Sequence, residues 1–383
     1  MSPYEEPERR RPPQDGESFN PFGVPVSYER PGRGDLVRWE ADAPLTPWWI
    51  RGHADLWVPV DHTEALFKHF VERGPDPVVL ADAGNHGHVV VASGAAGTGK
   101  TSLINRCVDD LARRLAPTTA GLPPDGPSDG GGDGAGPSEG ASGLWLPRDG
   151  YPGVEIIAVG GFRNADNGFS RRNGRRSGVD ELNRKIADRV LERLRADEEF
   201  WQGFDERRTQ ADDLSYLYED ISRRLNFVRR ILLIIVPDMR WLDSGLTTQF
   251  VSSFHSWAQP SIVFFLETSH TTLREELQEE FEGVHQPHLT LLELGSVNAE
   301  DWDVFITRRT VVDGLPGDSI TFAEEVIQNR PGRHLYRNVR QLQGFLYDMS
   351  DEAIRNREAA VRMNRLLRFA ERRDSDDLPD LEF

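Results

Sequence analysis

The feature that most constrains this chain is an apolar run that breaks into a glycine-rich turn and is followed at once by a helical pattern. Residues 88–102 read HVVVASGAAGTGKTS. The part from Gly94 to Thr101 matches G-x-x-x-x-G-K-[ST], the phosphate-binding loop, in the strand–loop–helix context that this motif requires. A glycine-rich turn that matches by chance is the alternative, and the flanking strand and helix patterns disfavour it. We therefore expect a triphosphate site at this turn.

Each residue type in the loop has a physical role in holding phosphate. Glycines let backbone N–H groups turn toward phosphate oxygens where a Cβ would obstruct them, and the start of the next helix adds unpaired donors. Lys100 is expected to reach the β- and γ-phosphates, and the Thr101 hydroxyl is expected to hold Mg²⁺. The residues expected to contact the nucleotide here are Gly94, Ala95, Ala96, Gly97, Thr98, Gly99, Lys100, Thr101 and Ser102.

Composition narrows the functional classes. The 383 residues carry a formal net charge of −18, which argues against a protein that binds nucleic acid with its whole surface. The single cysteine, Cys107, allows no intramolecular disulfide and is expected to be a small packing residue in a reducing compartment. No apolar run approaches the ~20 residues that span a bilayer, and the N-terminus lacks the apolar core of a secretory signal. We expect a cytoplasmic protein without a membrane segment.

Five segments have the pattern of strands, and helical patterns alternate with them. The run Ile231–Val236 is apolar throughout, as in parallel strands that are buried on both faces. Strands that alternate with helical crossovers indicate an α/β fold. We predict a parallel five-stranded P-loop NTPase sheet with flanking helices, followed by an all-helical C-terminal lid region. The predicted strands are 89–92, 154–160, 230–238, 260–269 and 289–294.

Composition also predicts how the chain is divided. The predicted parts are a disordered N-terminus at 1–18, a P-loop core at 19–296 that begins with a linker, a helical lid domain at 297–373, and an acidic tail at 374–383. A low-complexity insertion rich in Gly, Pro, Ser and Asp is expected to interrupt the core at 117–150. The helix after the loop is expected to end at Pro117.

Two stretches are rich in arginine. Residues 163–176 hold five arginines and one acid and follow the second predicted strand. Residues 330–373 hold eleven arginines and five acids, a net charge of +6. The first is either a solvated loop or a contact for phosphate or nucleic acid, and the second would bind DNA if the protein assists in nucleic-acid transactions.

Hydrolysis needs more than the loop: an acid that orients Mg²⁺, at the end of a buried strand beside the loop strand, and a group that positions the attacking water. Asp238 follows the most apolar strand and is the expected metal-orienting acid together with Thr101, unless it only forms a turn or caps a helix. The fourth predicted strand ends in Glu267, Thr268 and Ser269, and one of these would point at the γ-phosphate if that strand neighbours Asp238. The predicted catalytic residues are Lys100, Asp238 and Glu267.

The order of these features resembles that of AAA+ and STAND-type ATPases, and most of all the bacterial secretion- and transposition-associated ATPases and the origin-recognition-like proteins. Two N-terminal segments carry the resemblance, Asn20-Pro21-Phe22 and His62-Thr63-Glu64-Ala65-Leu66. Pro331-Gly332-Arg333-His334-Leu335 is similar to the lid motif of the family, which implies that Arg333 contacts the nucleotide as its sensor arginine. The resemblance implies ATP and Mg²⁺ as cofactors. Candidates for an arginine finger are Arg274, Arg308 and Arg309.

One position departs from the family pattern. The second motif of the family is four apolar residues followed by Asp and then Asp or Glu, whereas Val236 is followed here by Pro237 and Asp238. Either Asp238 serves the metal from one position further on, or the metal-orienting acid is missing and Glu267 or Asp243 replaces it. Binding of ATP is therefore better supported by the sequence than its hydrolysis.

These features predict an ATP-binding protein, an ATPase that acts as a nucleotide-dependent switch or remodeller of a partner protein. The expected partners are ATP, a protein that the sequence does not identify, and further copies of the chain in a nucleotide-dependent homo-oligomer, with nucleic acid as an additional candidate. A nucleotide-binding scaffold with weak or no hydrolysis is the alternative that Pro237 favours. A P-loop kinase is disfavoured because the helical region follows the sheet instead of being inserted after a middle strand.

Overall fold

A computed structural model describes most of the chain between residues 20 and 368. The described ranges are 20–28, 36–41, 43–60, 63–82, 85–119, 150–160, 178–202, 213–239, 242–280, 288–298, 300–310, 320–328, 336–356, 360–363 and 365–368, together with residues 204 and 358. The predicted disordered N-terminus, the arginine-rich stretch 163–176, the acidic tail and nearly all of the low-complexity insertion lie outside the described residues.

The chain forms two compact units. The sheet unit comprises His62–Asp133 and Asp149–Gly295. The helical unit comprises Met1–Asp61, Gly134–Arg148 and Ser296–Phe383. Residues 19–61, which the sequence pattern assigns to the P-loop core, group with the C-terminal region in the helical unit.

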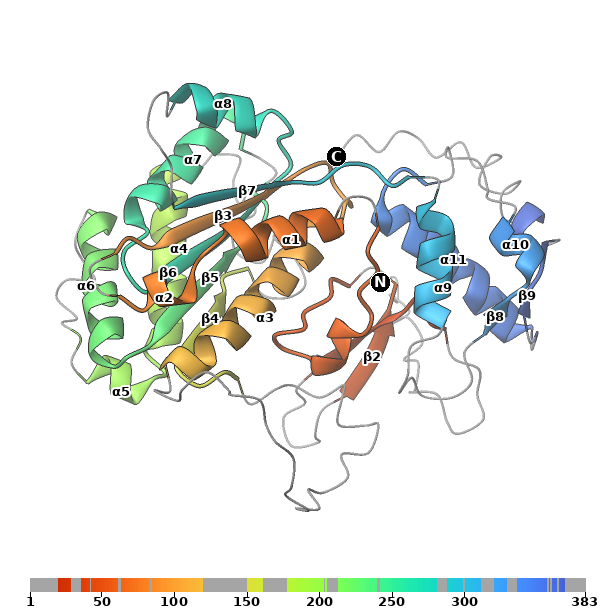
Figure 1. Ribbon diagram of the computed structural model, residues 1–383, viewed down its shortest axis with the longest axis horizontal. Coiled ribbons are helices and arrows are strands. Elements are labelled where there is room, and N and C mark those ends of the chain that lie inside the picture. The colour runs from red at the N-terminus through yellow and green to blue at the C-terminus, as the bar shows by residue number, and fades with distance from the viewer. Residues whose placement is uncertain are drawn as a thin grey trace, which may run out of the picture. The chain divides into compact units, whose positions relative to one another are not determined.

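The sheet unit is built on five parallel strands in the order β4-β5-β6-β3-β7 (Figure 1). The strands are β3 (His88–Ser93), β4 (Val154–Ala158), β5 (Ile231–Val236), β6 (Ile262–Thr268) and β7 (Leu289–Glu293). All five coincide with the predicted strands, apart from one or two residues at some ends. The predicted α/β class with a five-stranded parallel sheet is confirmed.

Helices cover both faces of this sheet. The chain crosses from the interior strand β3 to the edge strand β4 through α3 (Lys100–Thr119), and every later crossover runs in the opposite direction. Because such crossovers are right-handed, α3 lies on one face and the later helices lie on the other (Figure 1). These later helices are α4 (Val179–Leu194), α5 (Glu198–Trp201), α6 (Leu214–Phe227), α7 (Ser244–Trp257) and α8 (Leu273–Glu280). The short helices α1 (Thr63–Arg73) and α2 (Pro77–Leu80) pack beside α3.

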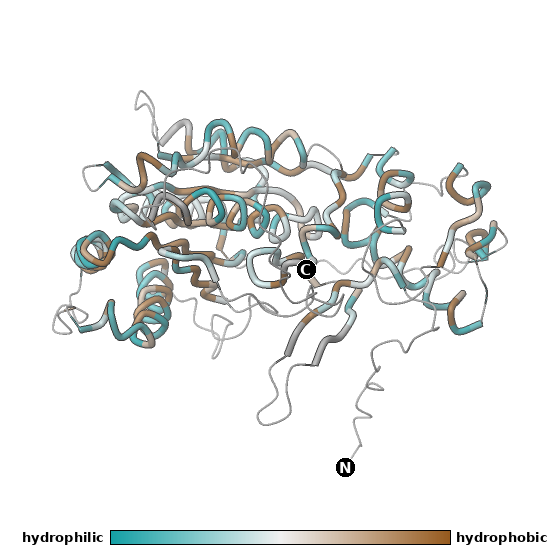
Figure 2. The backbone as a smooth tube through the Cα atoms, turned by 60° about the horizontal axis from the view of Figure 1, so that its bottom comes forward, coloured by the Kyte–Doolittle hydropathy of each residue, from teal (hydrophilic) through white to brown (hydrophobic). Residues whose placement is uncertain are grey.

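The core of the sheet unit follows from its hydropathy pattern. Every residue of β5 and β6 is buried, which confirms that these apolar runs are central strands. Figure 2 colours the chain by hydropathy, and hydrophobic segments, in brown, run through the sheet unit. On α3 the predicted apolar face is buried, and it includes Cys107. Burial raises the pKa of the Cys107 thiol, as expected for a packing residue. At about 25 cal/mol per Å² of buried apolar surface, these contacts dominate the stability of the unit.

One helix boundary differs from the expectation. The helix α3 does not end before Pro117 but continues to Thr119. Proline removes one backbone N–H donor and crowds the preceding turn. In the last turn of a helix this loss affects a single hydrogen bond, so the helix continues for two residues beyond Pro117.

The helical unit contains more β-structure than predicted. Its N-terminal part forms an antiparallel hairpin of β1 (Val24–Tyr28) and β2 (Leu36–Glu40), followed by the 3₁₀-helix η1 (Arg51–Ala54). Its C-terminal part consists of α9 (Asp301–Thr310), α10 (Glu324–Gln328) and α11 (Val339–Arg355), with a parallel pair of two-residue strands, β8 (Thr321–Phe322) and β9 (Ala360–Val361). The C-terminal region is thus mainly, but not entirely, helical.

A buried arginine holds the N-terminal segment on the C-terminal helices. Arg309 on α9 is 2% exposed. Its guanidinium donates hydrogen bonds to the carbonyls of Pro21 at 2.8 Å, Leu56 at 3.0 Å and Gly23 at 2.6 Å. Burial lowers the pKa of the Arg309 guanidinium to about 9, so the group stays charged at neutral pH. The hydrogen-bonding capacity of one cation thus fixes the path of the chain at three points.

Candidate nucleotide-binding site

The glycine-rich loop joins the end of β3 to the start of α3 at the carboxyl edge of the sheet (Figure 1). Three of its glycines have positive φ, at 147° for Gly94, 80° for Gly97 and 94° for Gly99, a backbone region that residues with a Cβ rarely enter. At Gly94 space is also limited, because a Cβ would lie 2.7 Å from the carbonyl oxygen of Leu294. The local sequence therefore forms the curled backbone that the motif predicts.

Lys100 lies within this loop. Its Nζ donates to the carbonyl oxygens of Gly94 at 2.7 Å and Ala95 at 2.9 Å, and the side chain is 6% exposed. A buried ammonium group needs such acceptors to replace water. The amino group is therefore held against the concave side of the loop, where a phosphate would supply further acceptor oxygens.

Asp238, which follows β5, lies near this ammonium group. Its Oδ2 is 4.0 Å from the Nζ of Lys100, and its side chain is 12% exposed. Ser269, just beyond the end of β6, donates a hydrogen bond to the same carboxylate. The Asp238 side chain is therefore oriented by a neutral donor and a nearby cation.

Glu267 is the second acid at this edge of the sheet. It belongs to β6, is 9% exposed, and accepts a hydrogen bond of 2.9 Å from the Thr101 hydroxyl at its Oε2. The predicted lysine, threonine and two acids thus lie together, in two pairs. Lys100 lies near Asp238, and Thr101 is bonded to Glu267.

The helix start next to the loop is electrostatically suited to an anion. The first turn of α3 contains no acidic residue. The N-terminus of a helix presents unpaired N–H groups and the positive end of the helix dipole. No cluster of three or more His, Cys, Asp or Glu in the described part of the chain is arranged to hold a metal ion by itself. Mg²⁺ does not require one, because it is usually held by one or two protein oxygens, water and phosphate.

The other predicted loop residues have distinct environments. Ala95 and Ala96 are exposed at the tip of the loop, and Thr98 is buried, with its hydroxyl bonded to the Ala95 carbonyl at 2.9 Å. Ser102 is partly buried in the first turn of α3. The predicted sensor residue Arg333 lies outside the described residues.

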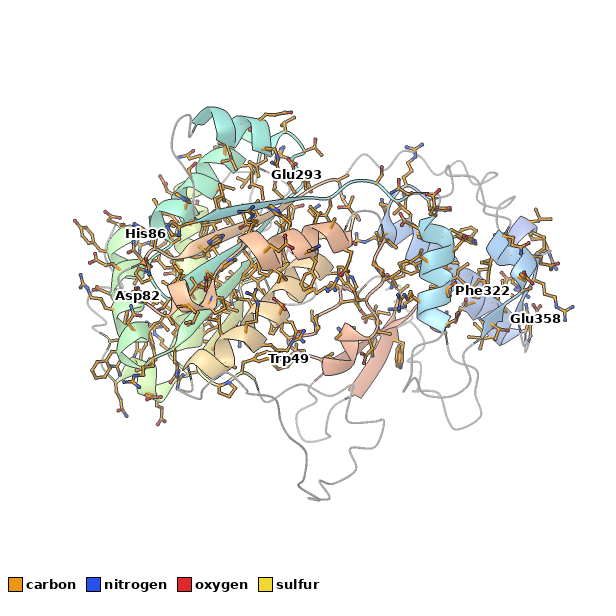
Figure 3. The ribbon with its side chains drawn as sticks, viewed as in Figure 1. Trp49, Asp82, His86, Glu293, Phe322 and Glu358 are labelled. Carbon is orange, nitrogen blue, oxygen red and sulfur yellow. The ribbon has the colours of Figure 1, made fainter. Side chains whose placement is uncertain are left out.

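The three arginine-finger candidates differ in accessibility. Arg309 is buried, and its guanidinium is hydrogen-bonded to three backbone carbonyls. It cannot extend toward a second subunit, so it was wrong as a candidate for the arginine finger. Arg274 on α8 is bonded at 2.7 Å to Glu293 at the end of β7, which Figure 3 labels. Arg308 is exposed on α9. The sequence does not distinguish Arg308 from Arg309, because only the fold determines which face of α9 is buried.

The position of the strand that carries Asp238 also differs from the expectation. It does not lie beside the loop strand, because β6 is inserted between β5 and β3. Strand order is a long-range property that the local pattern does not encode. This order places Glu267 next to Thr101, a contact that the sequence alone does not predict.

Comparisons with known proteins give structural likeness only. No protein-family profile matches the sequence, and no curated protein matches it significantly. ORC2 of Aeropyrum pernix, solved in ADPNP–ADP complexes, is 14% identical, with 82% of this chain and 67% of that chain covered and a TM-score of 0.43. CDC6P of Pyrobaculum aerophilum is 11% identical, with 80% and 67% covered and a TM-score of 0.42.

The Holliday junction branch migration motor RuvB of Thermotoga maritima is a third similar structure. It is 10% identical, with 82% of this chain and 69% of that chain covered and a TM-score of 0.39. At these identities and TM-scores the likeness concerns the path of the chain and assigns no residue a role. Among the described residues, no helix is both long and apolar enough to cross a bilayer.

Proposed function

We propose that this chain binds ATP with Mg²⁺ at the loop Gly94–Thr101 and works as an AAA+/STAND-like ATPase, a nucleotide-dependent switch that acts on a partner protein. The observation that carries this proposal is the meeting of four side chains at the carboxyl edge of the sheet. Lys100 lies 4.0 Å from Asp238, and Thr101 is bonded at 2.9 Å to Glu267. In open α/β sheets this edge is where ligands bind.

The residues fit a magnesium-bound triphosphate. Gly97 and Gly99 adopt positive φ and carry no Cβ that could stand between backbone N–H donors and phosphate oxygens. Lys100 supplies a positive charge that is already fixed in place, so little side-chain entropy is lost on binding. When bound, Mg²⁺ would neutralise charge that develops on the β- and γ-phosphates.

The side chains of the site would then have separate roles. The Lys100 ammonium would exchange loop carbonyls for phosphate oxygens. The Thr101 hydroxyl donates a hydrogen bond to the Glu267 carboxylate, so its oxygen lone pairs remain available for a cation. Asp238 is the candidate to position an attacking water, with Ser269 fixing its carboxylate.

A nucleotide-binding scaffold without hydrolysis is the second candidate function. Pro237 favours it, because proline occupies the position at which the resembled family has its first acid. Both candidate functions require the binding of ATP, and they differ only in whether the bound ATP is hydrolysed. The decisive measurements are therefore affinity and phosphate release in the same preparation.

The test compares Lys100→Ala with wild type by titration with ATP·Mg²⁺. We expect Lys100→Ala to weaken binding at least about tenfold, which is ~1.4 kcal/mol. The matched control is Lys68→Ala on α1, where the lysine is 74% exposed and paired only loosely with Glu72 at 3.8 Å. Unchanged affinity in Lys100→Ala would contradict the proposed site.

Phosphate release then separates ATPase from scaffold. We expect wild type to release phosphate and Asp238→Ala to lose most of that activity while it still binds ATP. A wild-type rate equal to that of Lys100→Ala would contradict the ATPase and leave the scaffold. Transfer of the γ-phosphate to a small molecule would instead indicate a kinase.

Assembly and nucleic-acid binding are tested separately. If the chain is a switch that assembles with nucleotide, its mass in solution is expected to increase when ATP·Mg²⁺ is added. If the stretch 330–373, with its net charge of +6, serves nucleic acid, DNA binding is expected at low salt and to weaken steeply as salt rises. Absence of binding at low salt would exclude that role.

A further inference from the structure

The carboxylate that contacts the metal-side threonine comes from an unexpected strand. Thr101 donates to Glu267 on β6, and not to Asp238, which follows β5. Glu267 pairs in register with Ala92, two residues before the glycine-rich loop begins. Its side chain therefore starts from the strand that lies directly beside the loop strand.

The register of β5 and β6 places Glu267 level with Pro237, the position at which the resembled family has its first acid. The last registered pair of the two strands is Val236 with Leu266, so the next pair along the chain is Pro237 with Glu267. An acid absent at Pro237 is thus present at the same level on the neighbouring strand, one strand closer to the loop. The longer glutamate side chain also suits a position from which the carboxylate must reach across to α3.

Pro237 itself cannot take part in polar chemistry, and its surroundings show a packing role. A Cβ added to Gly160 would lie 2.6 Å from the Cγ of Pro237. The proline ring therefore fills the space beside the end of β4. Asp238, one residue later, is engaged by Ser269 and lies near Lys100.

From these contacts we propose that Glu267 is the positioning carboxylate of the metal side, and that it acts through the Thr101 hydroxyl. Asp238 and Ser269 then serve the phosphate side together with Lys100. Of the acids that the sequence left open for the metal side, these contacts favour Glu267 on β6 over Asp238, which follows β5. The inference rests on the proposed nucleotide site.

The physical basis is the direction of one hydrogen bond. Because the Thr101 hydroxyl directs its hydrogen toward the Glu267 carboxylate, the hydroxyl oxygen can present lone pairs to a cation, and the nearby negative charge strengthens that attraction. A glutamine at 267 accepts the same hydrogen bond but removes the charge. Asparagine at 238 removes the charge of the other acid with equally little change of shape.

The test measures how much Mg²⁺ tightens nucleotide binding. A fluorescent AMP-PNP is titrated with excess Mg²⁺ and with EDTA, and the ratio of the two affinities is compared among wild type, Glu267→Gln and Asp238→Asn. Outer ligands of metal sites change metal affinity about 10- to 100-fold, so we expect Glu267→Gln to reduce the ratio by about tenfold or more. Its affinity in EDTA should stay within about twofold of wild type, and Asp238→Asn should keep the ratio within about threefold.

A second variant tests the route through the hydroxyl. Thr101→Val is expected to lose at least as much of the Mg²⁺ effect as Glu267→Gln, and the double variant is expected to lose no more than Thr101→Val alone. Should Glu267→Gln fail to fold, as judged by circular dichroism, Thr101→Val compared with Asp238→Asn still decides. Titration of free Mn²⁺ by electron paramagnetic resonance at saturating nucleotide gives an independent readout.

The outcomes are distinct from those for the proposed function. Loss of the Mg²⁺ effect in Asp238→Asn, with the effect retained in Glu267→Gln, would overturn the inference. Additive losses in the double variant would also overturn it, because Glu267 would then act independently of Thr101. Failure of wild type to bind nucleotide even in Mg²⁺ would instead overturn the nucleotide site itself.

Discussion

Pro237 packs directly against Gly160, at the ends of the neighbouring strands β5 and β4. A Cβ at Gly160 would lie 2.6 Å from the proline Cγ and 3.3 Å from its Cβ and Cδ. A five-membered ring cannot rotate away as a flexible side chain can. Pro237, which stands where the family pattern has its first acid, therefore packs against Gly160, a residue more than seventy positions earlier in the sequence.

Substitution of this glycine is predicted to destabilise the sheet unit. Gly160→Ala forces the new methyl group into the proline ring, at a cost of about 1–3 kcal/mol, the range for overpacked cores. Pro237→Ala in the same chain removes the obstruction, so the double variant is expected to recover most of that loss. Urea unfolding of the four members of this cycle measures the coupling. Additive effects of the two substitutions would contradict the contact.

A control for this cycle is available in the helical unit. Gly344 lies within α11, and a Cβ there would meet nothing within 4 Å. Gly344→Ala is therefore expected to stabilise by about 0.5–1 kcal/mol through helix propensity. The contrast in sign between the two glycine substitutions separates local packing from a general effect of replacing glycine.

Arg309 gives a second prediction, for the helical unit. Arg309→Met keeps the apolar length of the side chain but leaves three buried carbonyls, of Pro21, Gly23 and Leu56, without their donor. Each unpaired buried group costs about 1–3 kcal/mol, so a loss of about 3 kcal/mol or more is expected. The neighbouring Arg308 is exposed, and Arg308→Met is expected to change stability by less than about 0.5 kcal/mol. Thermal unfolding of both variants makes the comparison, and equal shifts would contradict the anchoring role.

Local patterns predicted the elements of the sheet unit well. The continuous apolar runs of β5 and β6 predict central parallel strands. In the structure these strands are buried at every residue. The loop geometry at Gly94–Thr101 follows from residues that are adjacent in sequence. The hairpin of β1 and β2 was missed although apolar residues alternate in both strands, because each strand has only five residues and Pro25 disfavours a strand at that position.

Long-range relationships were not predictable in the same way. Nothing near Glu267 in the sequence shows that its strand lies beside the loop strand, although the acid was recognised as a candidate. Likewise, Arg308 and Arg309 are chemically equal neighbours, and only the packing of α9 buries one of them. The contacts that determine the site depend on strand order and helix orientation, which tertiary packing fixes.

A buried histidine in the helical unit is kept neutral mainly by its burial. The Nδ1 of His53 accepts from the backbone N–H of Thr46 at 2.7 Å, so the proton resides on Nε2, which donates to the Pro25 carbonyl at 2.6 Å. Burial is the main cause that lowers the pKa of His53 to about 4; the hydrogen bond to the Pro25 carbonyl partly opposes this shift, and the charge of Arg309 adds to it. A second proton on this ring would require breaking the bond from Thr46.

This arrangement predicts a pH dependence of stability. Because the pKa of His53 is lower in the folded chain than the 6.5 of a free histidine, the unfolded chain binds more protons between about pH 4 and pH 6.5. Stability is therefore complete above pH 6.5 and falls as the pH is lowered through this window, by about 2 kcal/mol at pH 5 for this one group. His53→Gln, whose amide can offer one acceptor and one donor, removes the titration and should flatten the profile by that amount, whereas His69→Gln on the exposed face of α1 controls for the loss of an imidazole. Urea unfolding at pH 7 and pH 5 measures the difference, and parallel profiles for wild type and His53→Gln would show that His53 is not the group that titrates.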